Sequence, residues 1–189
     1  MALVQTFEKQ GNLLFKYRGQ FPVVLFLLAT VFIVFTDYTS ISETNERYYI
    51  IISVLLSLLG FIVRFYTIGT TPKGTSGRNT KEQVAEVLNS TGIYATVRHP
   101  LYLGNFLIWI GISTYVFSPL FIVIISLIFW LYYERIMFAE ERFLERKFGE
   151  EYLDWSNKIP AFIPNFPTIK HLPFLSQSKP FLDENIQES

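Results

Sequence analysis

The sequence predicts an all-α integral membrane protein: about four transmembrane helices including a helical hairpin, then a cytosolic C-terminal helix and a proline-rich segment. Composition is the first reason. Half of the 189 residues are hydrophobic and only 17% are charged, whereas about 25% are charged in a typical soluble domain. The mean hydropathy is +0.30. The second reason is that long stretches contain no charge. We expect one domain over residues 1–189.

Charge and composition exclude several classes of protein. The 16 Lys and Arg residues balance the 16 Asp and Glu residues, so no net positive field attracts a nucleic acid. The chain has no Cys and two His, so we expect neither a disulfide framework nor a metal site. The expected partners are the lipid bilayer and a membrane lipid or lipidated substrate, and the oligomeric state stays open.

The first two spans are expected at about 19–37 and 48–68. The uncharged run 21–35 (FPVVLFLLATVFIVF) is shorter than the roughly 20 residues of a span, but its polar and aromatic flanks extend it. A signal peptide is the alternative, although no small-residue cleavage site follows. The second span carries one charge, Arg64, near its end, where a long side chain can reach the membrane interface.

The third hydrophobic stretch is too long for one span. Residues 101–133 contain no charge, and as one helix they would extend about 50 Å, against a hydrocarbon core of about 30 Å. Pro119 lies near the middle, and proline starts helices far better than it continues them. We therefore predict a hairpin with spans 100–117 and 119–138. The second helix should continue to Phe148 and stop at Gly149.

Basic residues alternate along the chain in a way that predicts topology. The N-terminal flank, the loop after the second span and the C-terminal region contain several Lys and Arg residues. The first loop contains only Arg47, and the hairpin turn contains none. Because cytoplasmic loops are enriched in Lys and Arg, we expect both termini in the cytoplasm.

Arg98-His99-Pro100 forms the first candidate site. Pro100 suits the first turn of a helix and leaves Arg98 and His99 at the positive end of the helix dipole. Backbone amides at such an end favour an anion such as a carboxylate. The alternative is structural, with Arg98 on a lipid phosphate and His99 as an interfacial cap.

Glu140 and Glu141 form the second candidate site. They share a helix face with Met137 and Leu144, and an unpaired buried charge is very costly. The two carboxylates therefore either form salt bridges with Arg98 or Arg135 or hold a polar or cationic ligand. The proline-rich stretch 158–167 is expected to lie along the membrane surface or over a cavity.

Together these segments resemble a known family. TGIYATVRHPLYLG, the hydrophobic hairpin, EERFLERKFGEEYLDW and the proline-rich end are similar to isoprenylcysteine carboxyl methyltransferases, whose near relatives are phosphatidylethanolamine N-methyltransferases. The resemblance covers about 77–167. RHPxYxG alone also resembles membrane sterol reductases, but its pairing with EExxLxxxFGxEY is more specific. The resemblance implies a methyltransferase that uses S-adenosyl-L-methionine (SAM) from the cytosol and takes a lipid substrate from the bilayer.

The resemblance also implies roles for individual residues. The expected cofactor contacts are Leu88 and its neighbours, Tyr94, His99, Pro100, Leu101, Tyr102 and Glu140. The expected catalytic residues are Arg98, His99, Arg135 and Glu141. Family members hold the substrate carboxylate with an arginine one turn before the glutamate pair, where this chain has Ile136, with Arg135 one residue away. Glu86 stands where the family has a histidine.

Methyl transfer needs alignment of the reacting groups and exclusion of water more than covalent help. An anionic acceptor needs no base, whereas an amine would need one, for which His99 or Glu141 is the nearby candidate. We expect O-methylation of a membrane-embedded lipid or lipidated acceptor. The alternatives are a phospholipid N-methyltransferase, a sterol-type membrane reductase and a non-catalytic membrane protein.

Overall fold

The computed structural model describes residues 2–71 and 85–164. Every regular element within these residues is helical, which confirms the predicted all-α class. The elements are α1 (Leu3–Tyr17), α2 (Pro22–Phe35), η1 (Tyr38–Ser40), α3 (Glu43–Thr70), η2 (Gly92–Ala95), α4 (Pro100–Tyr115), α5 (Pro119–Phe148) and α6 (Glu150–Ser156).

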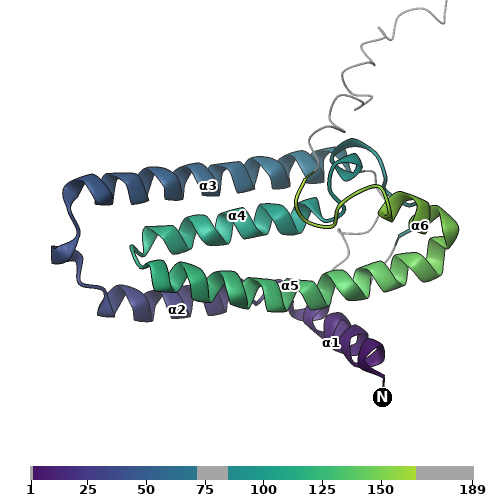
Figure 1. Ribbon diagram of the computed structural model, residues 1–189, viewed down its shortest axis with the longest axis horizontal. Helices are drawn as coiled ribbons and strands as arrows, with labels where there is room; N and C mark the ends of the chain where they lie inside the picture. The colour runs from purple at the N-terminus through teal and green to yellow at the C-terminus, as the bar shows by residue number, and fades with distance from the viewer. Residues whose placement is uncertain (1, 72–84, 165–189) are drawn as a thin grey trace, which may run out of the picture.

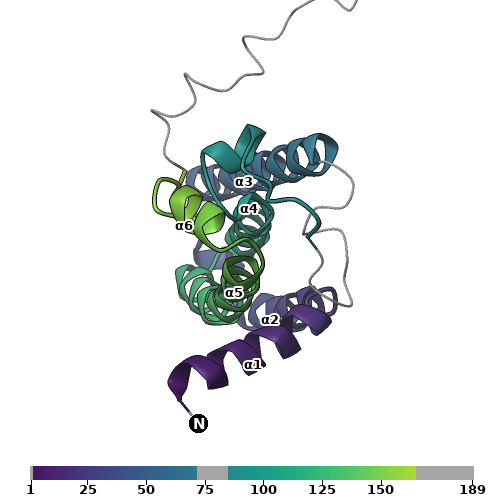
Figure 2. The same cartoon turned by 90° about the vertical axis from the view of Figure 1, so that its right-hand side faces the viewer.

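Four helices share one long axis. Figure 1 shows α2, α3, α4 and α5 running along the bundle, with the α2–α3 connection and the α4–α5 turn at the same end. The end-on view in Figure 2 places α4 between α3 and α5, and α4 packs against both. The opposite end gathers α6, η2 and the start of α2, and the candidate site lies there.

The predicted spans correspond to helices of unequal length. α3 (28 residues) and α5 (30 residues) are each long and apolar enough to cross a membrane. α2 has 14 residues and α4 has 16, which is less than the roughly 20 that a straight span requires. α1 and α2, bent by 79°, pass the same test only as a pair. Helices at all four positions are confirmed, while four crossings stay a prediction.

The hairpin begins and ends as its sequence predicts. Pro119 lies in the first turn of α5, and the Ser118 hydroxyl accepts a hydrogen bond from the backbone N–H of Phe121 at 3.3 Å. Phe117 lies in the hairpin turn and has a φ of 62°. It is the only non-glycine residue with positive φ in the described part of the chain. Gly149 ends α5 with φ 54°, a conformation that glycine adopts without strain. α6, a short separate helix, follows at once.

Small residues let α3 and α4 approach closely. A Cβ added at Gly60 would lie 2.7 Å from the carbonyl oxygen of Gly104, and one at Gly104 would lie 2.6 Å from Cγ of Arg64. Small residues allow this backbone contact between membrane helices. The close approach sets Arg64 directly against the first turns of α4.

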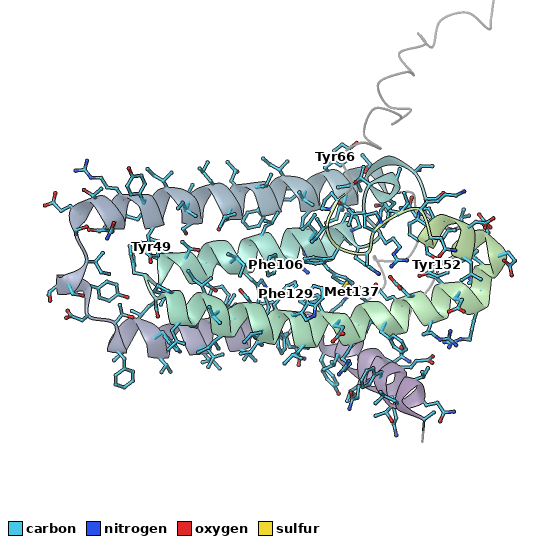
Figure 3. The ribbon with its side chains drawn as sticks, in the orientation of Figure 1. Tyr49, Tyr66, Phe106, Phe129, Met137 and Tyr152 are labelled. Carbon is cyan, nitrogen blue, oxygen red and sulfur yellow. The ribbon has the colours of Figure 1, made fainter. Side chains whose placement is uncertain are left out.

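Aromatic side chains fill the space between α4 and α5. Phe121, Ile125 and Phe129 of α5 recur every four residues and are fully buried. Figure 3 shows Phe106 and Phe129 between the two helices, with ring centroids 5.1 Å apart. By contrast, most Val, Leu and Phe side chains of α2 and α3 are exposed on the outside of the bundle, as expected of a surface that faces lipid.

Helix α1 is not predicted by the sequence pattern, because the residues before the first span carry only the signal of a basic flank. The helix packs across α5, with Gly11 and Phe15 buried. The Tyr132 hydroxyl of α5 donates a hydrogen bond to the carbonyl oxygen of Leu14 at 2.9 Å. The N-terminal segment therefore belongs to the folded body.

Candidate functional site

Figure 1 shows α6 at the end of the bundle away from the hairpin turn, and Tyr152 of α6 is one of the residues that line a cavity of about 420 Å³. Side chains of α2, α3, η2, α4, α5 and α6 and of the turn after α1 line it. Its volume falls within the roughly 300–1,000 Å³ of ordinary small-molecule sites. The structure brings to it all seven expected cofactor contacts, Leu88, Tyr94, His99, Pro100, Leu101, Tyr102 and Glu140, together with Arg98 and Glu141.

His99, the residue before α4, joins the two carboxylates of α5. Its Nε2 atom lies 2.9 Å from Oε1 of Glu141, and its Nδ1 atom lies 3.6 Å from Oε2 of Glu140. The residue is only 7% exposed, which excludes the interfacial cap. Burial lowers the pKa of His99, but hydrogen bonds and charge interactions with both glutamates outweigh it and raise the pKa above its ordinary value. The imidazolium form is thereby favoured.

Glu140 has further partners on two other elements. The Tyr102 hydroxyl of α4 donates a hydrogen bond to Oε1 of Glu140 at 2.8 Å. Nη1 of Arg18, just after α1, lies 3.8 Å from the same oxygen. The inward carboxylate predicted from the helix pattern is therefore compensated, as a buried charge must be.

Arg98 connects the site to the segment after α6. Its Nη2 atom lies 3.2 Å from Oε1 of Glu141, and its Nη1 atom donates to the carbonyl oxygen of Ser156 at 3.1 Å. The backbone N–H of Arg98 donates a hydrogen bond to the carbonyl oxygen of Pro160 at 2.9 Å. The backbone N–H of His99 donates one to the carbonyl oxygen of Ala161 at 3.1 Å. These two amides are consequently occupied and do not take part in binding an anion at this end of α4.

The described part of the proline-rich segment packs on the bundle. The Phe162 ring lies 5.6 Å from that of Phe106 and 6.4 Å from that of Phe129 between centroids. Together with the backbone pairing of Arg98 and His99, this contact fixes the entry into α4. The remainder of the predicted stretch, 165–167, lies outside the described residues.

Arg135 does not reach the cavity, so its expected role is not supported by the geometry. Its guanidinium lies 3.5 Å from the centroid of the Phe7 ring, and its Nη1 atom lies 3.4 Å from Oε2 of Glu134. One residue along a helix is a turn of about 100°, which carries Arg135 away from the face of Glu140. Ile136, which does share that face, is fully buried.

The sequence profile of the phospholipid methyltransferase family matches residues 48–151, more than half of the chain. The chain belongs to this family. The match begins at residue 48, before the region 77–167 that carries the resemblance in sequence. It includes α3 from residue 48 onward, all of α4 and α5 and the cavity residues that they contribute, but it leaves out α1 and α2.

Several relatives are similar over part of their length. The protein-S-isoprenylcysteine O-methyltransferase of Saccharomyces cerevisiae is 33% identical over 115 residues, covering 60% of this chain and 48% of the yeast protein. The mouse protein of that name is 35% identical over 83 residues, covering 44% of this chain and 29% of the relative. The chain thus spans half or less of these relatives.

A solved structure shares the fold. A eukaryotic intramembrane Ras methyltransferase, described as an isoprenylcysteine carboxyl methyltransferase, superposes with a TM-score of 0.60 at 23% identity. The likeness covers 75% of this chain and 51% of the solved chain. It supports an integral membrane architecture for the helices described above.

Some cavity residues were missed because their role depends on packing between helices. Arg64 was expected to reach the membrane interface, but its Nη1 atom donates a hydrogen bond to the side chain of Asn105. Nδ2 of Asn105 in turn donates to the Tyr133 hydroxyl at 3.0 Å. A polar Asn105 directly after Gly104 in an uncharged stretch was the available signal.

Asn89 was expected only as an unnamed neighbour of Leu88, and Arg18 was missed. The side-chain Nδ2 atom of Asn89 is buried and has no hydrogen-bond partner among the described residues, although Asn89 lines the cavity beside Leu88. The Arg18 guanidinium lies 3.7 Å from the centroid of the Phe15 ring. Its place in the site depends on α1, for which the sequence analysis made no prediction.

Proposed function

We propose that the protein transfers a methyl group from SAM to an anionic oxygen of a lipid or lipidated acceptor in the membrane. The observation that carries this proposal is the charged cavity. Its lining residues belong both to the apolar bundle helices and to the connecting segments outside them. Family membership supports the reaction class, and the names of the relatives support the oxygen acceptor.

The cavity has two chemically different sides. Leu88, Asn89 and Tyr94 come from the segment between α3 and α4, outside the apolar helices. Arg64, Trp109 and other lining residues come from the helices that form the apolar bundle. We assign the first side to SAM, entering from the cytosol, and the second to the acceptor, entering from the bilayer.

The first side fits SAM by its polar groups. The orphaned amide of Asn89 can donate a hydrogen bond to a ring nitrogen or ribose oxygen, and a buried donor without a partner is costly. Burial raises the pKa of the Tyr94 hydroxyl to about 12, so this group stays a neutral donor. Glu140 and Glu141 can accept from ribose hydroxyls or the amino group. SAM would supply a methyl group activated by its sulfonium sulfur.

The protein's own part is then alignment and charge. His99, held between two carboxylates, fixes the geometry of Glu140 and Glu141. Its raised pKa favours the protonated form, which cannot accept a proton. An anionic oxygen needs no base, whereas a protonated amine must lose a proton first. Three arginines and two carboxylates line the cavity, so an anionic acceptor is also favoured by charge. The acceptor oxygen bonds to the methyl carbon as the carbon–sulfur bond breaks.

Phospholipid N-methylation is the second candidate, because the matching family is described as phospholipid methyltransferases. It would require Glu141 or a deprotonated His99 to take a proton from the ammonium group. The S-isoprenylcysteine named in the relatives favours instead a carboxylate at the end of an isoprenyl chain.

The test uses purified protein in lipid nanodiscs with methyl-labelled SAM. One reaction contains an isoprenylated N-acetylcysteine with a free carboxylate, and the other contains phosphatidylethanolamine. We expect the label in a methyl ester of the isoprenylated cysteine. Mild alkali should hydrolyse this ester and release the labelled methyl group as methanol. Alkali-stable label in the phospholipid would overturn O-methylation in favour of N-methylation. No transfer to either acceptor or to a total membrane lipid extract would overturn the proposed function.

A further inference from the structure

We propose that Arg18 binds the anionic head of the acceptor and that α1, lying along the membrane surface, holds Arg18 at the cavity. The inference rests on the proposed function and adds to it a residue from outside the matched family region, since the match begins at residue 48. The proposed ligand is an anionic oxygen group at the end of a long apolar chain. This group is either a carboxylate or a phosphate.

The geometry of α1 is that of a helix in the plane of the membrane. It meets α2 at 79°, and Figure 1 shows it turning away from the axis shared by the four bundle helices. It exposes apolar side chains such as Leu3 and Leu13 together with the charged Lys9 and Lys16. A helix with this mixture lies at the boundary between head groups and acyl chains.

Contacts along its length hold α1 against α5. At Gly11 the helices are so close that an added Cβ would lie 2.6 Å from Cβ of Ala139. The Tyr132 hydroxyl donates a hydrogen bond to the carbonyl oxygen of Leu14 at 2.9 Å. Away from the cavity, Nη2 of Arg146 lies 2.6 Å from Oε1 of Glu8. The end of α1 is thereby fixed relative to the helix that carries Glu140.

Arg18 is the charged group that this arrangement brings into the cavity. It lines the wall with Gly19 and Pro22, and its side chain is only 14% exposed. The buried Phe15 ring supports one face of the guanidinium at 3.7 Å, while Glu140 lies 3.8 Å away. A guanidinium has five N–H donors in a planar fork and can contact Glu140 and a second anion together.

The position of Arg18 points to the acceptor. Arg18, just after α1, and Arg64 of α3 both line the cavity together with Tyr133, and Arg64 is linked to the Tyr133 hydroxyl through Asn105. Two cations from different parts of the chain therefore lie in the wall that the bundle helices form. α5 supplies no cation on this face, because Ile136 is buried and Arg135 lies against Phe7. The corner between an in-plane helix and a membrane helix is also the depth at which the head of a lipid lies.

The experiment compares Arg18→Gln and Arg18→Lys with Lys16→Gln, which removes the same charge from an exposed position of α1. Three ligands are titrated in nanodiscs: an isoprenylated N-acetylcysteine carboxylate, the corresponding carboxamide and an isoprenyl monophosphate. SAM affinity is measured separately by calorimetry. A tighter-binding anion identifies the head group as carboxylate or phosphate.

We expect Arg18→Gln to weaken binding of the preferred anion, and to raise its KM, at least tenfold. Carboxamide binding and SAM affinity should stay within threefold. Arg18→Lys should retain part of the affinity because it keeps the charge but loses the fork. Lys16→Gln should match wild type.

Three outcomes would overturn the role of Arg18. An equal loss of SAM affinity in Arg18→Gln would mean that Arg18 acts through Glu140 on the cofactor side. Unchanged affinity for both anions would remove Arg18 from the acceptor site, as would a wild type that binds the carboxamide as tightly as the anions. The binding titrations need no turnover, so they decide this role even if the wild-type protein transfers no methyl group.

Discussion

At the scale of the residue, the site depends on a histidine held between two carboxylates. His99 reaches Glu141 at 2.9 Å and Glu140 at 3.6 Å, so one imidazole fixes the spacing of two acidic groups that would otherwise repel each other. Sequence reasoning could place these residues on the correct faces because Pro100 and the pattern of α5 set the helix phase. It could not foresee that they contact one another.

Glu140→Gln should abolish SAM binding while the protein stays folded in detergent. The glutamine keeps an acceptor for Tyr102 but loses the charge, and a lost charge-assisted hydrogen bond costs about 1.5–3 kcal/mol, or at least tenfold in affinity. Calorimetry measures the effect. Glu134→Gln is the control, since Glu134 lies on the same helix but outside the cavity lining. SAM affinity within threefold of wild type would remove Glu140 from the cofactor site.

His99→Ala should lower kcat/KM by roughly 10²-fold or more, because misalignment in a transfer reaction costs on this scale. His171→Ala should have little effect, since His171 stands in a polar and proline-containing tail outside the described residues. Rates must be expressed per folded molecule. Similar rates for the two variants would leave His99 with a purely structural role.

The raised pKa of His99 predicts a pH dependence of stability. Its ordinary value is 6.5, and a group with a higher pKa in the folded state stabilises the protein fully below that value. This stabilisation is lost as the pH rises through the folded-state pKa. The difference in thermal unfolding midpoint between wild type and His99→Gln should therefore be largest below pH 6.5 and should shrink as the pH rises above that value. A difference that is constant or grows with pH would contradict the assignment.

At the scale of the element, local chemistry made some features predictable and packing made others unpredictable. Pro119 and Gly149 mark the start and end of α5 because their backbone preferences act within a single turn. Arg64 was misassigned because its environment is created by the close approach of α3 and α4 at Gly104. α1 was overlooked because a short amphipathic helix has no uncharged run.

Two glycines of α3 should respond oppositely to alanine. At Gly60 a Cβ would lie 2.7 Å from the Gly104 carbonyl oxygen and 2.9 Å from the Ile108 backbone nitrogen, and backbone atoms cannot move aside easily. Gly60→Ala should therefore lower the unfolding midpoint in detergent. At Gly69 a Cβ would meet nothing within 4 Å, so Gly69→Ala should be neutral or stabilise α3 by up to about 1 kcal/mol. Equal midpoints would show that the α3–α4 seam can relax.

At the scale of the whole molecule, the two ends of the bundle differ in charge. The hairpin turn at one end has no ionisable group, whereas the other end contains the cavity and its charged residues. The turn 116–118 and the poorly basic connection after α2 lie together at one end. Arg18 and Arg98 line the cavity, and the basic last turn of α5 lies at the end opposite the hairpin turn (Figure 1). This separation agrees with the charge alternation in the sequence.

The separation of the two ends predicts where reporters fused to the chain will lie. Basic residues favour the cytoplasmic side, so the cavity end and both termini should be cytoplasmic, where SAM is made. Fusions at residues 5, 42 and 185 test this with one reporter active only in the cytoplasm and another active only outside it. We expect the cytoplasmic reporter to be active at 5 and 185 and the external one at 42. External activity at either terminus would overturn the four-span topology, and with it the assignment of the Asn89 side of the cavity to a cytosolic cofactor.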